Sequence, residues 1–440
     1  MPSHFTNSFG TWYNRFYMRK ASPEKPDDGF KAVLRPISLL ALTVFIDLLG
    51  FGIILPNLPQ YIEHAVGADH SRAALVGSWL AASYSLSQFL CAPAWGRYSD
   101  RAGRRPVILL SLIGIAISYI LFGLSNGHLW MLFAARLAAG FLSSASIGVA
   151  FAYVADVTTP ANRAKGMGML GACFGLGFMF GPAIGGWLGA INLSLPAFVA
   201  AGLALVNFVA SCFLLPESLT VAERQRLAAQ GHESLVKLLK KVMSGSAGKL
   251  FGISFLLTFG FAAVEQVFGF FLLARGIAST ENQPQRMGTI LAVVGLVGII
   301  VQGGLMGRLV LQFGEGKVAQ LGLFILAVGY LSLLLPREYG WLIFLTTLPL
   351  SGGRSLAGTP ISALISRKAN LGQGLTLSVS QSLDALARTA GPLTAGWLFH
   401  TFGPTIPYQF SAGLTVLALV LTLMVPSILA LPQEKVGEMG

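Results

Sequence analysis

The sequence has little charge and few cysteines or histidines, and each shortage excludes a class of protein. Only 11% of the 440 residues are charged and 54% are hydrophobic, so the chain cannot cover an ordinary soluble surface. Three cysteines, all within apolar runs, are too few for a disulfide framework or a thiolate metal site. The six histidines fall in loops, in tails or at the ends of apolar runs. We therefore expect no metal, no cofactor and no enzymatic Ser/His/Asp site.

Nucleotide-driven chemistry is also unsupported, because the sequence has no phosphate-binding loop. The nearest fragment, residues 245–250, has the wrong spacing and ends in leucine instead of serine or threonine. Any uphill work must then draw on an ion gradient or on the gradient of a solute. A proton that enters down about 150 mV supplies about 3.5 kcal/mol.

Long apolar runs are what the chain has in abundance. Twelve of them approach the ~20 residues that cross a hydrocarbon core of ~30 Å. They are continuously apolar rather than alternating, which favours helices over a barrel. The predicted spans are 37–59, 75–95, 107–125, 129–154, 166–189, 195–215, 250–274, 287–311, 317–335, 341–366, 375–398 and 406–430. The expected fold class is an all-α membrane protein with twelve transmembrane helices in two pseudo-symmetric six-helix bundles.

The basic residues sort to one side of these spans. With a cytoplasmic N-terminus, 23 of the 30 Lys and Arg fall inside, four outside and three within helices, so the positive-inside rule places both termini in the cytoplasm. The net charge of +12 then faces anionic lipid and does not indicate nucleic-acid binding. The predicted organisation is a cytoplasmic segment 1–36 without signal-peptide features, a bundle 37–216, a cytoplasmic loop 217–249 with amphipathic charge spacing, a bundle 250–431 and a cytoplasmic tail 432–440.

A charged patch reveals an internal repeat. Residues 96–106 read GRYSDRAGRRP, and a degraded copy, GRLVLQFGEGK, lies at 307–317, displaced by 211 residues. Asp100 and Arg104 lie one helical turn apart in the first copy. Leu311 stands at the position of Asp100 in the second copy, so we expect no matching charged latch there and asymmetric gating by the two halves.

Charges within apolar helices cost ~3 kcal/mol or more each and are therefore candidates for function. Asp47 and Glu265 are separated by 218 residues, and so are Arg136 and Arg354, so each half carries one acid and one base at equivalent positions. If these helices line one cavity, neighbouring charges can set the protonation of the two carboxyl groups. The alternative is that Asp47 pairs permanently with an arginine and only holds helices together.

One further acid and base lie together in the eleventh predicted span. Asp384 and Arg388 are spaced i, i+4, which predicts a local ion pair that neutralises both charges in lipid.

Small residues form a possible close-packing face in the fifth span. Gly177, Gly181 and Gly185 recur every four residues beside Gly186, and Pro182 kinks the helix. This face can act as a sliding seal, although such faces also occur for packing alone. Gly391-Pro392 and Gly396 repeat the pattern at a displacement of 210 with one glycine lost, so we expect the second copy to pack but to matter less for function.

The patch GRYSDRAGRRP resembles the loop signature between helices two and three of the major facilitator superfamily. Further family-like segments are IDLLGFGIILPNLP at 46–59, RLAAG at 136–140, DVTTPANRAKGMG at 156–168 and GFMFGPAIGGW at 177–187. The GPAIGG element resembles the fifth-helix signature of drug:proton antiporters, and together with LPES at 215–218 it is most similar to tetracycline-resistance-type exporters. Ser118 and Leu326 stand where that group has acids, which argues against tetracycline itself.

The resemblance implies roles for particular residues. Asp47, Arg136, Glu265 and Arg354 would face a central cavity. Asp100 would face a helix N-terminus of the other half while Arg104 reaches Asp156, which would latch the outward-facing state. The implied cytoplasmic gate comprises Gly96, Asp100, Arg101, Gly103, Arg104, Arg105, Asp156 and Arg163.

The function that these features predict is proton-coupled efflux of amphipathic small molecules by a monomer in a bacterial inner (plasma) membrane. Its expected partners are the substrate, protons and lipid. One alternative with the same fold is a facilitator or proton symporter that imports a metabolite. Another, from a different class, is a receptor or scaffold that transports nothing, against which the membrane-embedded acids weigh.

Overall fold

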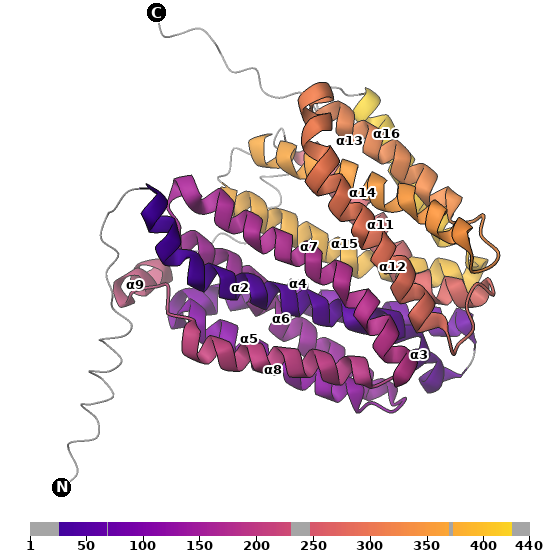
Figure 1. Cartoon of the computed structure of the whole chain (residues 1–440), viewed down its shortest axis with the longest axis horizontal. Coiled ribbons are helices and arrows are strands. Elements are labelled where there is room, and N and C mark those ends of the chain that lie inside the picture. Colours follow the sequence, from indigo (N-terminus) through magenta and orange to yellow (C-terminus); the bar gives the residue numbers. More distant parts are fainter. Residues whose placement is uncertain (1–25, 68, 230–246, 369–372, 425–440) are drawn as a thin grey trace, which may run out of the picture.

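A computed structural model describes residues 26–67, 69–229, 247–368 and 373–424. The N-terminal segment up to residue 25, most of the predicted interdomain loop and the predicted tail lie outside the described residues. Within them the chain is helical and has no strand. Figure 1 shows the helices as one bundle in which the two halves come together beside α3 and diverge toward the end where α9 lies.

The described part of the first half contains six long helices and three short ones. The long helices are α2 (Pro26–Ile54), α4 (His70–Ala102), α5 (Arg104–Gly123), α6 (Leu129–Val157), α7 (Pro160–Ile191) and α8 (Leu195–Leu214). The 3-10 helix η1 (Leu55–Asn57) and α3 (Leu58–Val66) extend α2, and α9 (Val221–Ala229) follows α8. The α9 segment falls in the loop for which an amphipathic helix was predicted.

The second half repeats this arrangement. Its helices are α11 (Gly248–Ala274), α12 (Gln283–Ile299), the π-helix η2 (Ile300–Leu305), α13 (Met306–Ser332), α14 (Trp341–Lys368), α15 (Gln373–Phe402) and α16 (Ile406–Met424). The twelve predicted spans all correspond to helices, but several helices run past the predicted ends. In α4, for example, Asp69 caps the start by accepting bonds from the backbone N–H groups of Ser71 and Arg72, and the charged end extends beyond the apolar run.

By length and apolarity alone, eight segments of the described residues could cross a membrane. One of them, Gln283–Ser332, is 50 residues long and is broken at Gly314, where φ is 77° and ψ is 157°, so it accounts for two spans. The remaining helices α4, α14 and α15 carry the more polar sequences. Their polar side chains face neighbouring helices, as the contacts below show.

The two halves share backbone features as well as helices. Gly103, between α4 and α5, has φ 104° and ψ 161°, close to the conformation of Gly314, which lies 211 residues later. A positive φ of this kind favours glycine because a Cβ would be strained. Pro93 within α4 and Gly304 within the π-helix η2 are related by the same displacement. The repeat expected from sequence is therefore present in the fold.

Candidate functional site

Asp47 lies buried in α2 without a full set of hydrogen bonds. The residue is 6% exposed, and its Oδ2 has no hydrogen-bond partner among the described residues, while the hydroxyl of Ser146 lies near enough to act on the carboxyl group. Tyr119 donates a long bond of 3.5 Å to the backbone carbonyl of Asp47, not to the carboxyl group. A buried carboxylate with an unpaired oxygen is costly in hydrocarbon, which makes this group a candidate for function.

Aromatic rings surround Arg136 of α6. The guanidinium carbon lies 5.8 Å from the ring centroid of Phe51, 5.9 Å from that of Tyr84 and 5.3 Å from that of Phe122. These rings come from α2, α4 and α5, and the hydroxyl of Tyr84 bonds to Ser143 at 2.8 Å. The arginine is thus held by cation–π contacts and leaves Asp47 without an ion pair.

Glu265 of α11 occupies a comparable position in the second half. Its Oε1 is buried without a partner, and the guanidiniums of Arg354 and Arg388 act on it electrostatically. Arg354 lies over the ring of Phe261 at 5.4 Å. The buried hydroxyl of Tyr330 likewise has no hydrogen-bond partner among the described residues. In the second half the acid therefore lies near Arg354 without an ion pair, and in the first half Asp47 and Arg136 both act electrostatically on Tyr84 and Tyr119.

The predicted ion pair within α15 is not formed. Asp384 instead accepts a hydrogen bond of 2.9 Å from Thr258 Oγ1 of α11. Arg388, one turn later, is exposed and acts electrostatically on Tyr84 of α4 and on Glu265. The i, i+4 spacing permitted an ion pair with Arg388, but Asp384 forms its hydrogen bond with a residue on the adjacent helix. Arg388 therefore joins the central charges, a role that sequence spacing did not indicate.

Across the described residues, no ion pair within 4.0 Å involves any of these six charged side chains. A permanent Asp47–arginine bridge is accordingly not what the structure has. The central region combines unpaired carboxyl groups, guanidiniums and rings from both halves. This region is therefore the candidate functional site.

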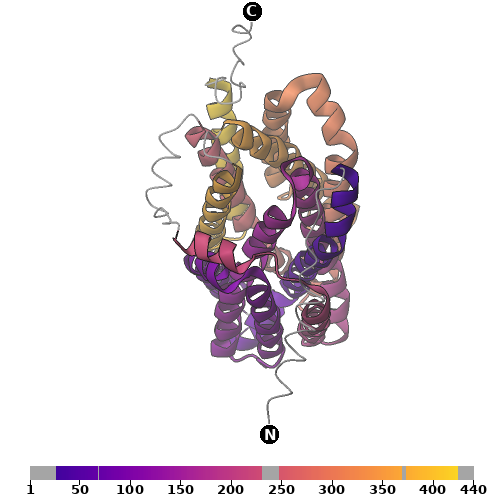
Figure 2. The same ribbon diagram turned by 90° about the vertical axis from the view of Figure 1, so that its left-hand side faces the viewer.

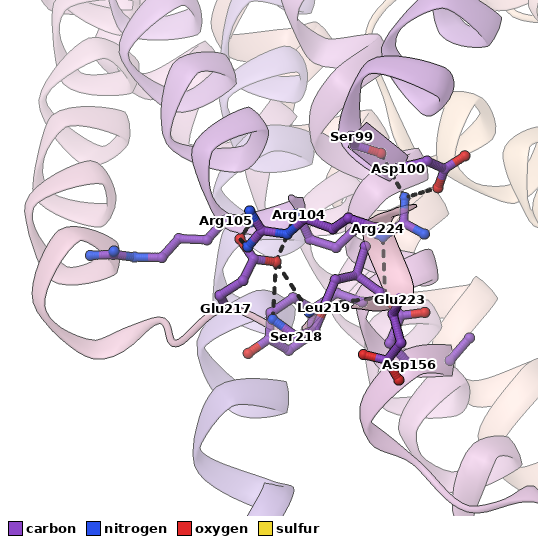
Figure 3. A network of polar contacts seen from close by, with 12 residues as sticks. Ser99, Asp100, Arg104, Arg105, Asp156, Glu217, Ser218, Leu219, Glu223 and Arg224 are labelled. Atoms are coloured by element: carbon purple, nitrogen blue, oxygen red, sulfur yellow. Dashed lines mark hydrogen bonds and ion pairs between the residues drawn. The ribbon is translucent and has the colours of Figure 1, made fainter. Parts of the chain in front are cut away.

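Figure 2 shows the α9 end of the bundle, which we call the basic end. Arg104 is the centre of a polar network there (Figure 3). Its Nη1 lies 2.7 Å from Asp100 Oδ1 and donates to Ser99 Oγ at 2.6 Å, while its Nε donates to Asp156 Oδ2 at 3.1 Å. The expected contact between Arg104 and Asp156 is present, and it joins α5 to α6.

The other predicted gate residues play simpler parts. Arg105 donates to the carbonyl of Cys212 at 2.6 Å, and Arg163 donates to that of Ala155 at 3.1 Å. Arg101 is exposed, and no atom lies within 4 Å of a Cβ built on Gly96. The structure thus brings Asp100, Arg104 and Asp156 together and leaves Arg101 and Gly96 outside the network.

Glu217 is a member of this network that the sequence reading did not assign. Its carboxylate accepts bonds from the backbone N–H groups of Arg104 at 2.8 Å and Arg105 at 3.3 Å, so it caps α5. Arg224 of α9 reaches both Glu217, at 3.4 Å, and the carbonyl of Ala102, at 3.1 Å. The motif LPES therefore ties the loop signature to α9, a contact visible in Figure 3.

The second half contains an ion pair of reversed polarity at the matching place. Glu315 stands 211 residues after Arg104, Arg367 stands 211 residues after Asp156, and their side chains lie 3.0 Å apart. Leu311 is 89% exposed and forms no charged contact, as expected. The expectation that the second copy lacks a charged latch was thus wrong in part, because exchange of both partners preserves the attraction between helices.

At the opposite end, beside α3, polar contacts join the two halves directly. Gln60 donates to the carbonyl of Thr280, Thr280 Oγ1 lies 3.5 Å from Glu63, and Glu63 pairs with His70 at 2.6 Å.

Two more contacts at this end link α4 to the second half. Ser71 lies 3.2 Å from Nδ1 of His400, and Gln266 donates to the carbonyl of Gly77 at 3.2 Å. The two halves are therefore in contact at the α3 end, opposite the basic end.

The small-residue face of α7 meets two different neighbours. Cβ atoms built on Gly177 and Gly181 would lie 2.6 Å from the carbonyl of Phe45 and 2.8 Å from the Cα of Gly52, so these glycines pack against α2 of the same half. Gly186 meets Gly288 of α12, with 2.9 Å between its built Cβ and that Cα. The single face expected from sequence is two adjacent faces, of which only the Gly186 side lies between the halves.

The second copy in α15 follows the same division. Gly391 packs against the carbonyl of Phe259 in α11, and Gly396 packs against Ser78 of α4 in the other half. Both crossings between the halves are therefore tight, although Gly186 meets backbone atoms of α12 and Gly396 meets chiefly the Ser78 side chain. The loss of one glycine, replaced by the buried Ala395, has not opened this contact.

Comparison with known proteins gives the family. A family model of the Major Facilitator Superfamily matches residues 40–373. The chain belongs to this superfamily. It is 30% identical to multidrug resistance protein 2 of Bacillus subtilis (strain 168) over 396 residues, which are 88% of this chain and 94% of that protein. It is 34% identical to the class C tetracycline resistance protein of Escherichia coli over 352 residues, covering 80% of this chain and 86% of that protein.

A solved structure of the superfamily agrees in fold. The crystal structure of the human organic anion transporter MFSD10 (TETRAN) superposes with a TM-score of 0.68 at 27% identity, covering 88% of this chain and 99% of that one. This facilitator-superfamily chain is accordingly a multi-pass membrane transporter with multidrug and tetracycline efflux relatives, and its superfamily is one of transporters, not enzymes.

Proposed function

We propose that the protein exports amphipathic small molecules in exchange for protons by alternating access. The observation that carries this proposal is the pair of buried carboxyl groups, Asp47 and Glu265, at equivalent positions of the two halves, each with an unpartnered oxygen. Protonation removes the cost of an uncompensated charge in hydrocarbon, and deprotonation frees the carboxylate to attract a substrate. Binding of substrate and binding of protons then compete, which is what antiport requires.

Export is proposed as the direction of transport because of the efflux relatives and because of the side of the membrane on which we place each end of the bundle. We place the basic end, together with both termini, in the cytoplasm and the α3 end outside, so the described conformation faces inward. The two six-helix bundles, 37–216 and 250–431, are then the units that rock against each other. We expect a bacterial plasma membrane as the location. We also expect a monomer, because a single chain supplies both bundles and all of the central charged residues.

Proton release on substrate binding tests this proposal. In weakly buffered detergent solution, addition of a binding dye to the purified protein should release protons, because the dye displaces them from the carboxyl groups. Asp47→Asn and Glu265→Gln should each reduce the release while the dye still binds. Proton uptake on binding, or release that is unchanged in both variants, would contradict antiport at these groups.

A second candidate follows from the three guanidiniums of Arg136, Arg354 and Arg388, none of which has a carboxylate within 4.0 Å in the part of the chain that the structure describes. Protonation of the acids would leave this region positive and would favour an anion that travels with a proton, as in the importer alternative. The relative MFSD10 carries the name of an organic anion transporter. Proton uptake when an anionic dye binds, in the same titration, would favour this candidate.

A further inference from the structure

The first helix breaks where Asn57 lies. The sequence Leu-Pro-Asn-Leu-Pro at 55–59 ends α2 at Ile54, forms η1 and starts α3. Prolines lack the N–H group that a continuous helix needs, so carbonyl groups near this break require other donors. The Asn57 side chain is fully buried, and its Nδ2 donates to the carbonyl of Ile53 at 3.0 Å.

The same amide also crosses to α7. Nδ2 donates at 3.0 Å to the carbonyl of Gly185, 128 residues away, so both hydrogens of the amide are used. Oδ1 then has no hydrogen-bond partner among the described residues. It lies against Gly189, where a Cβ would overlap it. The amide therefore fits only because position 189 is glycine.

The hydrogen bond between Asn57 and Gly185 lies next to the place where α7 of the first half crosses α12 of the second half. Gly185 is followed by Gly186, whose other side packs against the Cα of Gly288 and the carbonyl of Pro284 in α12. Pro182, one turn earlier, meets Gly52 of α2 on one side, and its carbonyl meets Gly288 on the other. A shift of α7 relative to the break in the first helix would thus move the surface that α12 packs against.

We propose that Asn57 is a positioning residue of the seal at the α3 end: by holding the Gly185 carbonyl, it keeps α7 closed against α12 and blocks proton leak past that crossing. The proposal rests on the proposed function only for the identity of the ion. Loss of two buried hydrogen bonds is expected to raise the frequency of opening about tenfold.

Proton leak without substrate tests this role. Proteoliposomes with an imposed pH gradient and an internal pH dye should acidify about tenfold faster with Asn57→Leu than with wild type. The matched control is Asn207→Leu. Asn207 is also a buried amide with an unpartnered Oδ1, and it bonds to α2 through Thr43 Oγ1 at 3.0 Å, but its hydrogen bond links α8 to α2 and does not reach α7. It should lose comparable thermal stability and leak no more than wild type.

A second pair of variants keeps the proposal testable if Asn57→Leu fails to fold. Gly189→Ala should push the amide away and leak, while Gly202→Ala, where no atom lies within 4 Å of the added Cβ, should not. Leak at the wild-type rate in folded Asn57→Leu or Gly189→Ala would overturn the proposal. Equal leak in Asn207→Leu would also overturn it, by showing only general loosening. Failure of proton-coupled transport in wild type would instead leave the leak comparison intact.

Discussion

At the scale of single residues, the central charges are distinguished by what they do not contact. Asp47 and Glu265 are buried acids with unpartnered oxygens, and Arg136 is held by aromatic rings instead of a carboxylate. If these residues only formed structural ion pairs, each carboxylate would contact a guanidinium, because an unpaired charge is costly in lipid. This open arrangement is what the proposed proton exchange requires of the two carboxyl groups.

Asp100 gives the first prediction. Its contact with Arg104 orients the guanidinium that also holds Asp156. Asp100→Asn removes one charge from this network and should lower the initial rate of dye efflux about tenfold or more, since charged buried bonds contribute ~1.5–3 kcal/mol. Leu311→Asn at the matching position of the second half is the control and should have little effect. Equal losses in the two variants would mean that the loop signature only sets topology.

The reversed pair Glu315–Arg367 gives a second prediction. Glu315→Arg should bring two like charges together and slow transport, and adding Arg367→Glu should restore the attraction and much of the rate. Because Arg367 is largely exposed, the expected coupling is small, about 1 kcal/mol or less. A double-mutant cycle on efflux rates measures it, and a double variant no faster than Glu315→Arg would show that the pair does not couple these helices.

At the scale of helices, sequence predicted the elements well and their contacts poorly. Twelve apolar runs gave twelve spans, and the cost of charge in lipid picked out Asp47, Arg136, Glu265 and Arg354. The π-helix η2 left no such signal, and helix ends were displaced where polar residues continue past the hydrocarbon core, as in α4.

The contact between Arg104 and Asp156 was expected from the family resemblance, but other partners far apart in sequence could not be predicted. Asn57 and Gly185 are separated by 128 residues, and Glu217 and Arg104 by 113. Local spacing predicted an ion pair between Asp384 and Arg388, yet Asp384 instead accepts a hydrogen bond from Thr258 on a neighbouring helix. Which polar side chain satisfies which backbone group depends on how helices cross, and a single sequence does not record that.

The two faces of α7 give a third prediction. Gly186→Leu should prevent α7 from approaching Gly288 of α12 and abolish efflux, since a bulky side chain cannot enter a backbone contact of this closeness. Gly175→Leu on the same helix, where space is open, should be tolerated. Gly396→Leu should be as damaging as Gly186→Leu, because both glycines lie between the halves. Normal dye efflux by Gly186→Leu would remove the seal from the mechanism.

At the scale of the whole molecule, the halves touch at the α3 end and diverge at the basic end (Figure 1). A fourth prediction follows from the contact between Ser71 and His400. With the native cysteines replaced by serine, Ser71→Cys with His400→Cys should form a disulfide that holds this end shut and stops transport until a reductant is added. Undiminished transport by the crosslinked protein would show that the α3 end need not open.

The central claim is that Glu265 exchanges protons during export, and pH-driven uptake into inside-out vesicles tests it most directly. With an acidic interior and a difference of about two pH units, the wild-type protein should accumulate a dye substrate up to about a hundredfold for one proton exchanged. Glu265→Gln should bind the dye and fail to accumulate it. Full pH-driven uptake by Glu265→Gln would contradict the account.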